Sequence, residues 1–220
     1  CVIHCAGQVR GSQEDVFTHC NVSGSLRLMQ AVQAGGHCQR FLFISSLAAR
    51  YPQLSWYANS KFIAEQKLTA MASDISLGIF RPTAVYGPGD KELKPVFNWL
   101  LRGILPRLGY AESLLSFLHV SDLAEAVYQW VITETSETTP FELCDGVIEG
   151  YSWKRLQEIG SRIRGNPVHL IGVPLPLLKL AADVSMLSHR IRRKAPMLTR
   201  SKIRELTRND WSASNSHISK

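Results

Sequence analysis

Two side chains four residues apart, Tyr57 and Lys61, could together carry acid–base chemistry. If the segment that holds them is a helix, this spacing puts both side chains on one face. An isolated phenol has a pKa of about 10, and a neighbouring ammonium favours the phenolate and lowers that pKa. Neither Tyr51 nor Tyr86 has a lysine at the fourth following position. We therefore expect Tyr57 to exchange a proton with a substrate, although a Tyr-x-x-x-Lys pattern alone also occurs in exposed helices.

Small or hydroxyl-bearing residues follow three short apolar runs, which are typical of buried parallel strands. The runs are residues 1–3, 41–44 and 77–80. Ligands of open parallel sheets bind outside the carboxyl ends of the strands, so chemistry is expected there. Considered alone, the residues after each strand could equally form a turn or cap the next element. The residues concerned are Ala6, Gly7, Ser45, Ser46, Pro82 and Thr83.

Helical spacing of apolar residues alternates with these strands. It predicts a helix from Gln13 to Ala34, which stops at two glycines, and another from Ser55 to Met71. Alternating strands and helices indicate an α/β fold with a doubly wound parallel sheet. After residue 90 the pattern loosens into a second, smaller lobe. There we expect strands at 117–120 and 141–143 and helices at 95–102, 123–131, 151–164 and 177–191.

The composition is that of a globular protein, with 45% hydrophobic and 20% charged residues among 220. The formal net charge is +7, and the only dense group of basic residues is at 190–194. No aromatic residues lie among them, so we do not expect nucleic acid as a partner. No apolar segment is long enough to span a bilayer, and we expect a cytoplasmic location. Five cysteines without a Cys-x-x-Cys pair predict neither a disulfide framework nor a metal site.

Six segments, in this order, resemble the extended short-chain dehydrogenase/reductase family, also called the NAD-dependent epimerase/dehydratase family. They are V-I-H-C-A-G, N-V-S-G-S, F-L-F-I-S-S, Y-A-N-S-K, R-P-T-A-V-Y-G-P-G-D and F-L-H-V-S-D-L-A-E-A. The resemblance implies that residues 1–146 are a partial Rossmann-like domain that binds NAD or NADP, with inserted lobe segments at about 90–118. Residues 147–220 would then form a C-terminal α/β substrate lobe.

The resemblance also implies roles for individual residues. Ser46 would hold the reacting oxygen, Tyr57 would exchange its proton, and Lys61 would bond the nicotinamide ribose and tune Tyr57. The nicotinamide itself would supply or accept the hydride. The nicotinamide end of the cofactor would lie against Ala6, Gly7, Ser45, Pro82 and Thr83, besides Tyr57 and Lys61.

The sequence departs from the family pattern in three ways. The family's G-x-x-G-x-x-G loop is not found, and the first motif corresponds to the fourth strand, so we expect three strands, two helices and the ribose-reading residue upstream. Ser214-Asn215-Ser216 resembles the start of a terminal motif that normally continues. Leu115 stands where sugar-nucleotide epimerases often have a diphosphate-binding arginine, which favours a less anionic, apolar small-molecule substrate.

Three classes of function follow from the resemblance. The first is an NAD(P)-dependent dehydrogenase or reductase of a carbonyl or secondary alcohol, and the second a sugar-nucleotide epimerase or dehydratase with tightly bound NAD. The third is a non-catalytic binding protein on the same fold. Homodimers would pair through the helices that begin near Gln13 and Ser55. The apolar stretch from Val173 to Leu187 either packs on its own lobe, lines a substrate pocket, or rests on a membrane.

Overall fold

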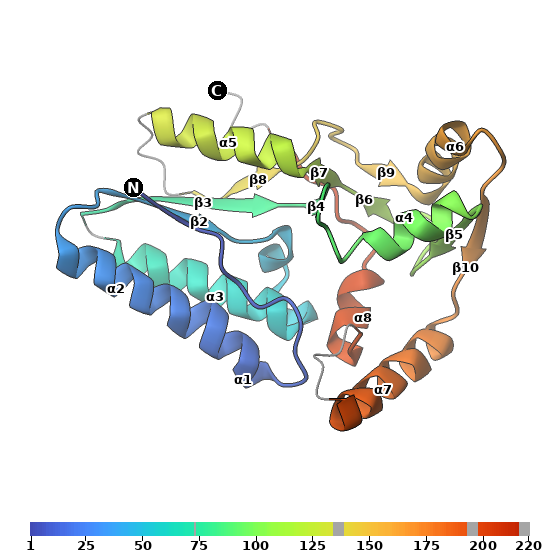
Figure 1. Ribbon diagram of the computed structural model, residues 1–220, viewed down its shortest axis with the longest axis horizontal. Coiled ribbons are helices and arrows are strands. Elements are labelled where there is room, and N and C mark those ends of the chain that lie inside the picture. Colours follow the sequence, from blue (N-terminus) through green and yellow to red (C-terminus); the bar gives the residue numbers. More distant parts are fainter. Residues whose placement is uncertain (73, 134–138, 193–197, 216–220) are drawn as a thin grey trace.

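A four-stranded parallel sheet forms the centre of the computed structural model, which describes residues 1–72, 74–133, 139–192 and 198–215, without the side chains of 188–192. Its strands are β1 (Val2–His4), β2 (Arg40–Ile44), β3 (Ser76–Pro82) and β8 (Phe141–Leu143), in the order β1-β2-β3-β8 (Figure 1). All three pairings are parallel. The predicted α/β fold, with strands near 1–3, 41–44 and 77–80 side by side, is confirmed.

The alternation of side chains along β2 explains how one strand supports two cores. Phe41 and Phe43 are fully buried in a cluster with residues of the helices on one face, including Met29 and Leu68. Leu42, between them in sequence, belongs to a second cluster on the opposite face. Because neighbouring side chains of a strand point to opposite faces, an uninterrupted apolar run requires cover on both sides.

One face of the sheet carries the helical segment that precedes β2, together with α3 (Trp56–Met71) (Figure 1). The predicted helix over 13–34 is continuous in the chain but consists of α1 (Glu14–Phe17), the π-helical η1 (Thr18–Gly24) and α2 (Ser25–Gly35). It ends as expected, because Gly36 takes the left-handed conformation at φ 66° that glycine adopts without strain. The opposite face is covered by α5 (Val120–Ile132).

A glycine in β3 permits the close packing of α5. A β-carbon on Gly78 would lie 2.6 Å from Nε1 of Trp130, well inside contact distance. The Trp130 side chain is buried, and Arg40 stacks on its ring at 4.1 Å. The missing side chain of Gly78 therefore determines how near α5 lies to the sheet.

The second lobe is built from short strand pairs. Of these strands, only the one expected at 117–120 was predicted, because two to four residues are usually too few to show a period. The pairs are β4 (Ala84–Tyr86) with β7 (Phe117–His119), β5 (Ile104–Arg107) with β10 (His169–Gly172), and β6 (Leu114–Leu115) with β9 (Tyr151–Ser152). Two helices, α4 (Lys94–Leu101) and α6 (Trp153–Arg164), pack with them around Leu105, Trp153 and Val168.

Two further helices complete the lobe, α7 (Leu175–Arg192) and α8 (Arg200–Leu206). Leu178 and Ala182 of α7 pack against Ile203 of α8, as expected for a helix on its own lobe. A second set of apolar side chains on α7 is exposed: Leu177, Leu180, Val184 and Leu187. In the part of the chain that the structure describes, no helix is long and apolar enough to cross a membrane. The side chains of the basic cluster at 190–194 lie outside the described residues.

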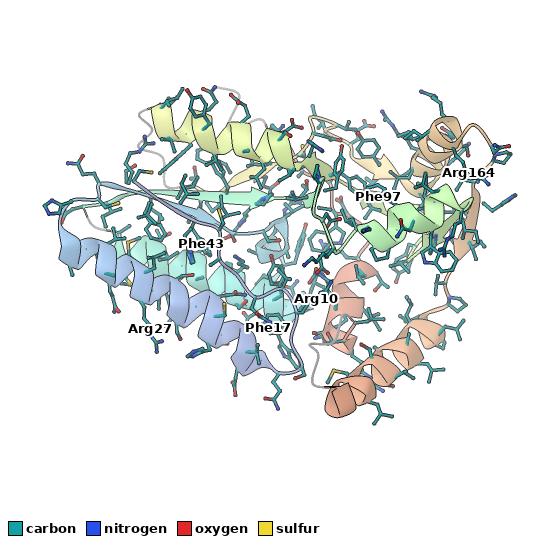
Figure 2. All side chains as sticks on the ribbon, viewed as in Figure 1. Arg10, Phe17, Arg27, Phe43, Phe97 and Arg164 are labelled. Atoms are coloured by element: carbon teal, nitrogen blue, oxygen red, sulfur yellow. The ribbon has the colours of Figure 1, made fainter. Side chains whose placement is uncertain are left out.

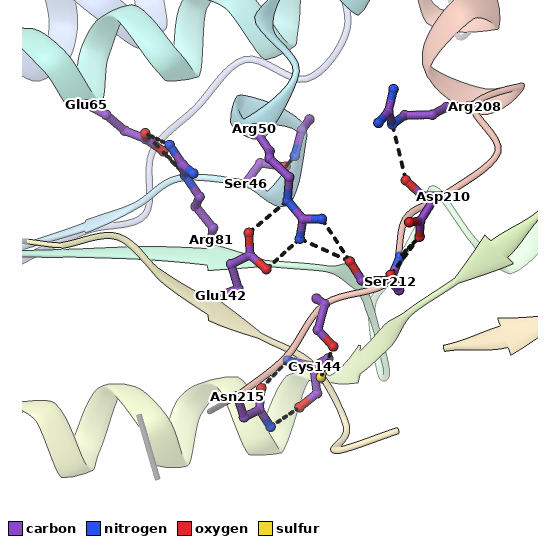
Figure 3. Close-up of polar contacts among 12 residues, drawn as sticks. Ser46, Arg50, Glu65, Arg81, Glu142, Cys144, Arg208, Asp210, Ser212 and Asn215 are labelled. Carbon is purple, nitrogen blue, oxygen red and sulfur yellow. Dashed lines mark hydrogen bonds and ion pairs between the residues drawn. The ribbon is translucent and has the colours of Figure 1, made fainter. Parts of the chain in front are cut away.

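The end of the described chain returns to the main sheet (Figure 3). The Asn215 side chain accepts a hydrogen bond from the Cys144 backbone N–H at 2.8 Å and donates one to the Cys144 carbonyl at 2.9 Å. Arg50 pairs with Glu142 and donates to the Ser212 carbonyl. These contacts fasten the segment after α8 to the carboxyl end of β8, and so bring α8 close to α3.

Candidate active site

Tyr57 lies in the first turn of α3, directly after the chain has left β2 through two short 3-10 helices, η2 (Leu47–Arg50) and η3 (Pro52–Leu54). Ser55 begins α3 as its N-cap, and its side chain accepts a 3.0 Å hydrogen bond from the Ala58 N–H. The Tyr57 hydroxyl lies close enough to Ser46, the residue that caps η2, for Ser46 to lower the pKa of Tyr57. The structure therefore brings Ser46 and Tyr57 together.

Lys61 lies one turn further along α3 and is buried, with 3% of its surface exposed. Its ammonium donates a 2.9 Å hydrogen bond to the carbonyl of Ile44, the last residue of β2, and lies 4.8 Å from the centre of the Phe43 ring. Burial lowers the pKa of Lys61 to about 8, partly opposed by Glu65. The amine is held at the carboxyl end of the sheet, on the helix that carries Tyr57.

The pKa of Tyr57 differs from the expectation. Sequence reasoning predicted that Lys61 would lower it, whereas the pKa of Tyr57 in this chain is raised to about 12. The largest cause is removal of the hydroxyl from water. Ser46 acts in the opposite direction, and the carboxylates of Glu205 and Glu92 raise the pKa further. Lys61, the cation that the spacing suggested, does not contribute to this shift, and desolvation is its largest cause.

The loop after β1 passes directly over Lys61. Ala6 and Gly7 are exposed, and a β-carbon on Gly7 would lie 3.0 Å from Nζ of Lys61. The Gly7 position is therefore open on one side and filled by the lysine on the other.

Asn21 holds this loop in place, a role that sequence reasoning did not assign. It is completely buried in η1, where its Oδ1 accepts a 2.6 Å hydrogen bond from the Gln8 N–H and its Nδ2 donates to the Gln8 carbonyl and to Ser60 Oγ. The side chain thus joins the loop after β1 to α3. The N-V-S-G-S motif was the available signal, and the π-helical turn around Asn21 is a feature often found at functional sites.

Ser45 is placed differently from its neighbour Ser46. Its buried hydroxyl donates to Glu65, whose carboxylate also pairs with Arg81 through contacts of 3.0 and 2.5 Å (Figure 3). This hydroxyl is engaged inside the fold. That Ser45 binds cofactor stays a prediction, in which its oxygen could act only as an acceptor while the proton is donated to Glu65.

The end of β3 offers a free polar group instead. Pro82 pairs with Leu143, and the Thr83 N–H donates to the Leu143 carbonyl at 3.0 Å. The buried Thr83 Oγ1 has no hydrogen-bond partner among the residues that the structure describes. A buried hydroxyl without a partner is costly, and a bound polar ligand would relieve that cost. With the open backbone at Gly7, it fits the nicotinamide end of a dinucleotide, which Ala6, Gly7, Lys61, Pro82 and Thr83 would hold.

Two charged residues of α8 stand beside Tyr57 and were not predicted. Glu205 is buried and accepts a 2.7 Å hydrogen bond from Ser55 Oγ, and it pairs with Lys202. Nζ of Lys202 lies 5.6 Å from the centre of the Tyr57 ring. No local pattern announces this contact, because residues about 150 positions apart are brought together only by the fold.

The parallel sheet with helices on both faces defines the class of Rossmann-type α/β proteins. The chain belongs to the NAD dependent epimerase/dehydratase family, whose model matches residues 1–141. This confirms the family that the six motifs resembled, and the family is one of NAD-dependent enzymes.

Two curated relatives represent different reactions within it. A protein named ceramide reductase, from Caulobacter vibrioides, is 32% identical over 214 residues, covering 97% of this chain and 65% of that protein. A protein named UDP-glucose 4-epimerase, from Vibrio cholerae, is 26% identical over 171 residues, covering 66% of this chain and 52% of that protein. The chain thus spans between about half and two thirds of the length of these relatives.

Among solved structures, MoeE5 in complex with UDP-glucose and NAD aligns with a TM-score of 0.66 at 26% identity. The alignment covers 78% of this chain and 64% of MoeE5. This similarity supports the same fold and the same class of cofactor.

Proposed function

We propose that the intact protein is an NAD(P)-dependent dehydrogenase or reductase that acts on a carbonyl or a secondary alcohol. The observation that carries this proposal is the buried Lys61, which is bonded to the Ile44 carbonyl at the carboxyl end of β2 and lies one helical turn from Tyr57, the residue whose pKa Ser46 influences. When bound, NAD or NADP supplies or accepts the hydride. Residues 1–146 provide the cofactor side of the site and residues 147–220 the substrate lobe.

Each of the three residues has a separate task in the proposed reaction. Ser46 donates a hydrogen bond to the substrate oxygen and holds it beside Tyr57. In reduction the Tyr57 hydroxyl gives its proton to that oxygen as negative charge develops there, and in oxidation it takes the proton back. The Lys61 ammonium, which is bonded to the Ile44 carbonyl, would bond a ribose hydroxyl and stabilise the phenolate that remains after proton transfer.

The raised pKa of Tyr57 bears on its part in the proposed proton transfer. With a pKa of about 12, Tyr57 is protonated at neutral pH and is ready to act as an acid. Oxidation would start from the phenolate, which burial and the nearby carboxylates disfavour. The protonated Tyr57 is thus the form that can donate a proton when a carbonyl is reduced.

An apolar substrate is the second part of the proposal. Leu115, in the position where sugar-nucleotide epimerases often have an arginine, packs with Leu105 and Trp153 in the lobe core and brings no cation to the site. The relative named ceramide reductase matches nearly the whole chain, and a ceramide is a long-chain lipid. Both observations support a long-chain ketone as substrate.

A sugar-nucleotide epimerase or dehydratase is the alternative, favoured by the relative named UDP-glucose 4-epimerase and by the UDP-glucose bound in MoeE5. The two reactions differ in whether reduced cofactor is consumed. The intact protein should be incubated with NADH or NADPH and a micellar long-chain ketone, and separately with NAD and UDP-glucose, while the absorbance of the reduced nicotinamide is followed.

We expect stoichiometric loss of reduced cofactor with the ketone. Interconversion of UDP-glucose without net loss of reduced cofactor would establish the alternative. Pairing of two copies through the helices near Gln13 and Ser55 stays a prediction, which measurement of the mass in solution tests.

A further inference from the structure

A narrow pocket of about 20 Å³ opens beside Tyr57, between the loop after β1 and the residues around the start of α8. Arg10 and Phe17 line one side, and Ser201 and Lys202 line the other. In Figure 2, Arg10 lies at the junction between the helices under the main sheet and the second lobe. The volume has room for about one water-sized group, so whatever enters it must be small and attached close to the reacting atom.

Each of the two cations in this lining is already paired with a carboxylate. The Arg10 guanidinium contacts Oε1 of Glu92 through both Nε and Nη2, at 2.7 Å each. Lys202 pairs with Glu205. The formal charge of the four groups together is zero.

The second pair is anchored more firmly than a surface ion pair. Glu205 has 10% of its side chain exposed, and its other oxygen accepts a 2.7 Å hydrogen bond from Ser55 Oγ. Ser55 in turn caps α3, two residues before Tyr57. Separating Lys202 from Glu205 would therefore leave a largely buried carboxylate beside Tyr57, which is unfavourable.

We propose that this pocket is a subsite for a small uncharged hydrogen-bonding group, a hydroxyl, carried next to the reacting carbonyl, and that the two ion pairs beside it keep phosphates away. An uncharged group can bond the Ser201 hydroxyl or a remaining N–H of Lys202 without breaking either ion pair. A phosphate would have to displace Glu92 or Glu205 or lie against them, and like charges in close contact cost binding energy. The proposal rests on the proposed function only in treating the pocket beside Tyr57 as the substrate site.

The test is anion binding, measured without turnover. The intact protein, with its nucleotide site filled by saturating NAD, is titrated with uridine diphosphate by calorimetry. The variants are Glu92→Gln and Glu205→Gln, which leave Arg10 and Lys202 without a counter-charge. Glu142→Gln is the matched control, because it raises the net charge equally and frees Arg50, which does not line the pocket.

We expect the wild type and Glu142→Gln to bind uridine diphosphate no better than millimolar. Each pocket variant should bind it at least about tenfold more tightly, the size of a charge-assisted hydrogen bond. Because Glu92 is on an exposed loop, Glu92→Gln tests the proposal even if Glu205→Gln fails to fold.

Tight binding by the wild type would overturn the proposal, and so would an equal gain in the control or no gain in the pocket variants. Failure of the proposed function would be seen elsewhere, as no consumption of reduced cofactor with any uncharged ketone.

Discussion

The Lys61 ammonium donates a 2.9 Å hydrogen bond to the carbonyl of Ile44, the residue at which β2 ends. This contact joins the helix that carries Tyr57 to the strand that leads into Ser46. It also keeps an amine with a pKa of about 8 inside the fold, where its charged form is disfavoured. Burial at the end of β2 thus both positions Lys61 and disfavours its charged form.

The first prediction concerns the pH dependence of stability. The pKa of Lys61 is about 8 in the folded chain and 10.5 ordinarily, so between these values the unfolded chain binds more protons. The stability of the folded state relative to a Lys61→Met variant should therefore rise with pH from 8 to 10, by ~1 kcal/mol per pH unit. Urea unfolding of both proteins at pH 7, 8, 9 and 10 measures the difference. Parallel pH profiles would mean that Lys61 titrates normally.

The second prediction separates chemistry from folding at Tyr57. Tyr57→Phe removes only the hydroxyl, so the intact protein should fold normally while its turnover falls by about 10²- to 10⁴-fold, as for lost acid–base catalysis. Tyr51→Phe is the control, because Tyr51 also lies close to charged groups, with Arg208 3.2 Å from the centre of its ring, but has no lysine one turn onward. Near-normal turnover of Tyr57→Phe with the best substrate would show that the Ser46 contact is structural.

The third prediction uses the unpaired hydroxyl of Thr83. Thr83→Val keeps the shape of the side chain and removes a buried oxygen that has no partner among the described residues. The variant should be as stable as the wild type or slightly more stable, because an unsatisfied polar group is lost. Its affinity for NAD or NADP, measured by fluorescence titration of the intact protein, should fall about tenfold if this oxygen bonds the cofactor. Unchanged affinity together with lower stability would show that the hydroxyl has a structural partner instead.

The fourth prediction tests the packing of α5 on the sheet. Gly78→Ala would place a β-carbon 2.6 Å from the Trp130 ring, so it should destabilise the fold by about 1–3 kcal/mol, as overpacked cores do. Gly35→Ala, in α2 with nothing within 4 Å, is the matched control and should stabilise the helix by roughly 0.5–1 kcal/mol. Chemical denaturation of both variants measures the sign of each change in the free energy of unfolding. Equal changes in the two variants would contradict the packing argument.

The sequence by itself determined the α/β class, the three parallel strands near residues 1–3, 41–44 and 77–80, and the helix that presents Tyr57 and Lys61 on one face. These features follow from local rules, because burial on both faces requires continuous apolar runs and helical geometry brings the fourth following residue alongside. The six motifs determined the family in the same way, since each is a short local pattern.

Only the tertiary structure decided what surrounds those residues. The engagement of Ser45 by Glu65, the anchoring of the loop by Asn21, and the approach of Glu205 to Ser55 depend on the packing of distant segments. The sign of the pKa shift at Tyr57 was decided there as well, because burial is a property of the assembled fold and here it acts together with Glu205 and Glu92 to raise the pKa, against the influence of Ser46. Spacing can show which groups are near in sequence, but the balance of desolvation and charge is set by everything packed around them.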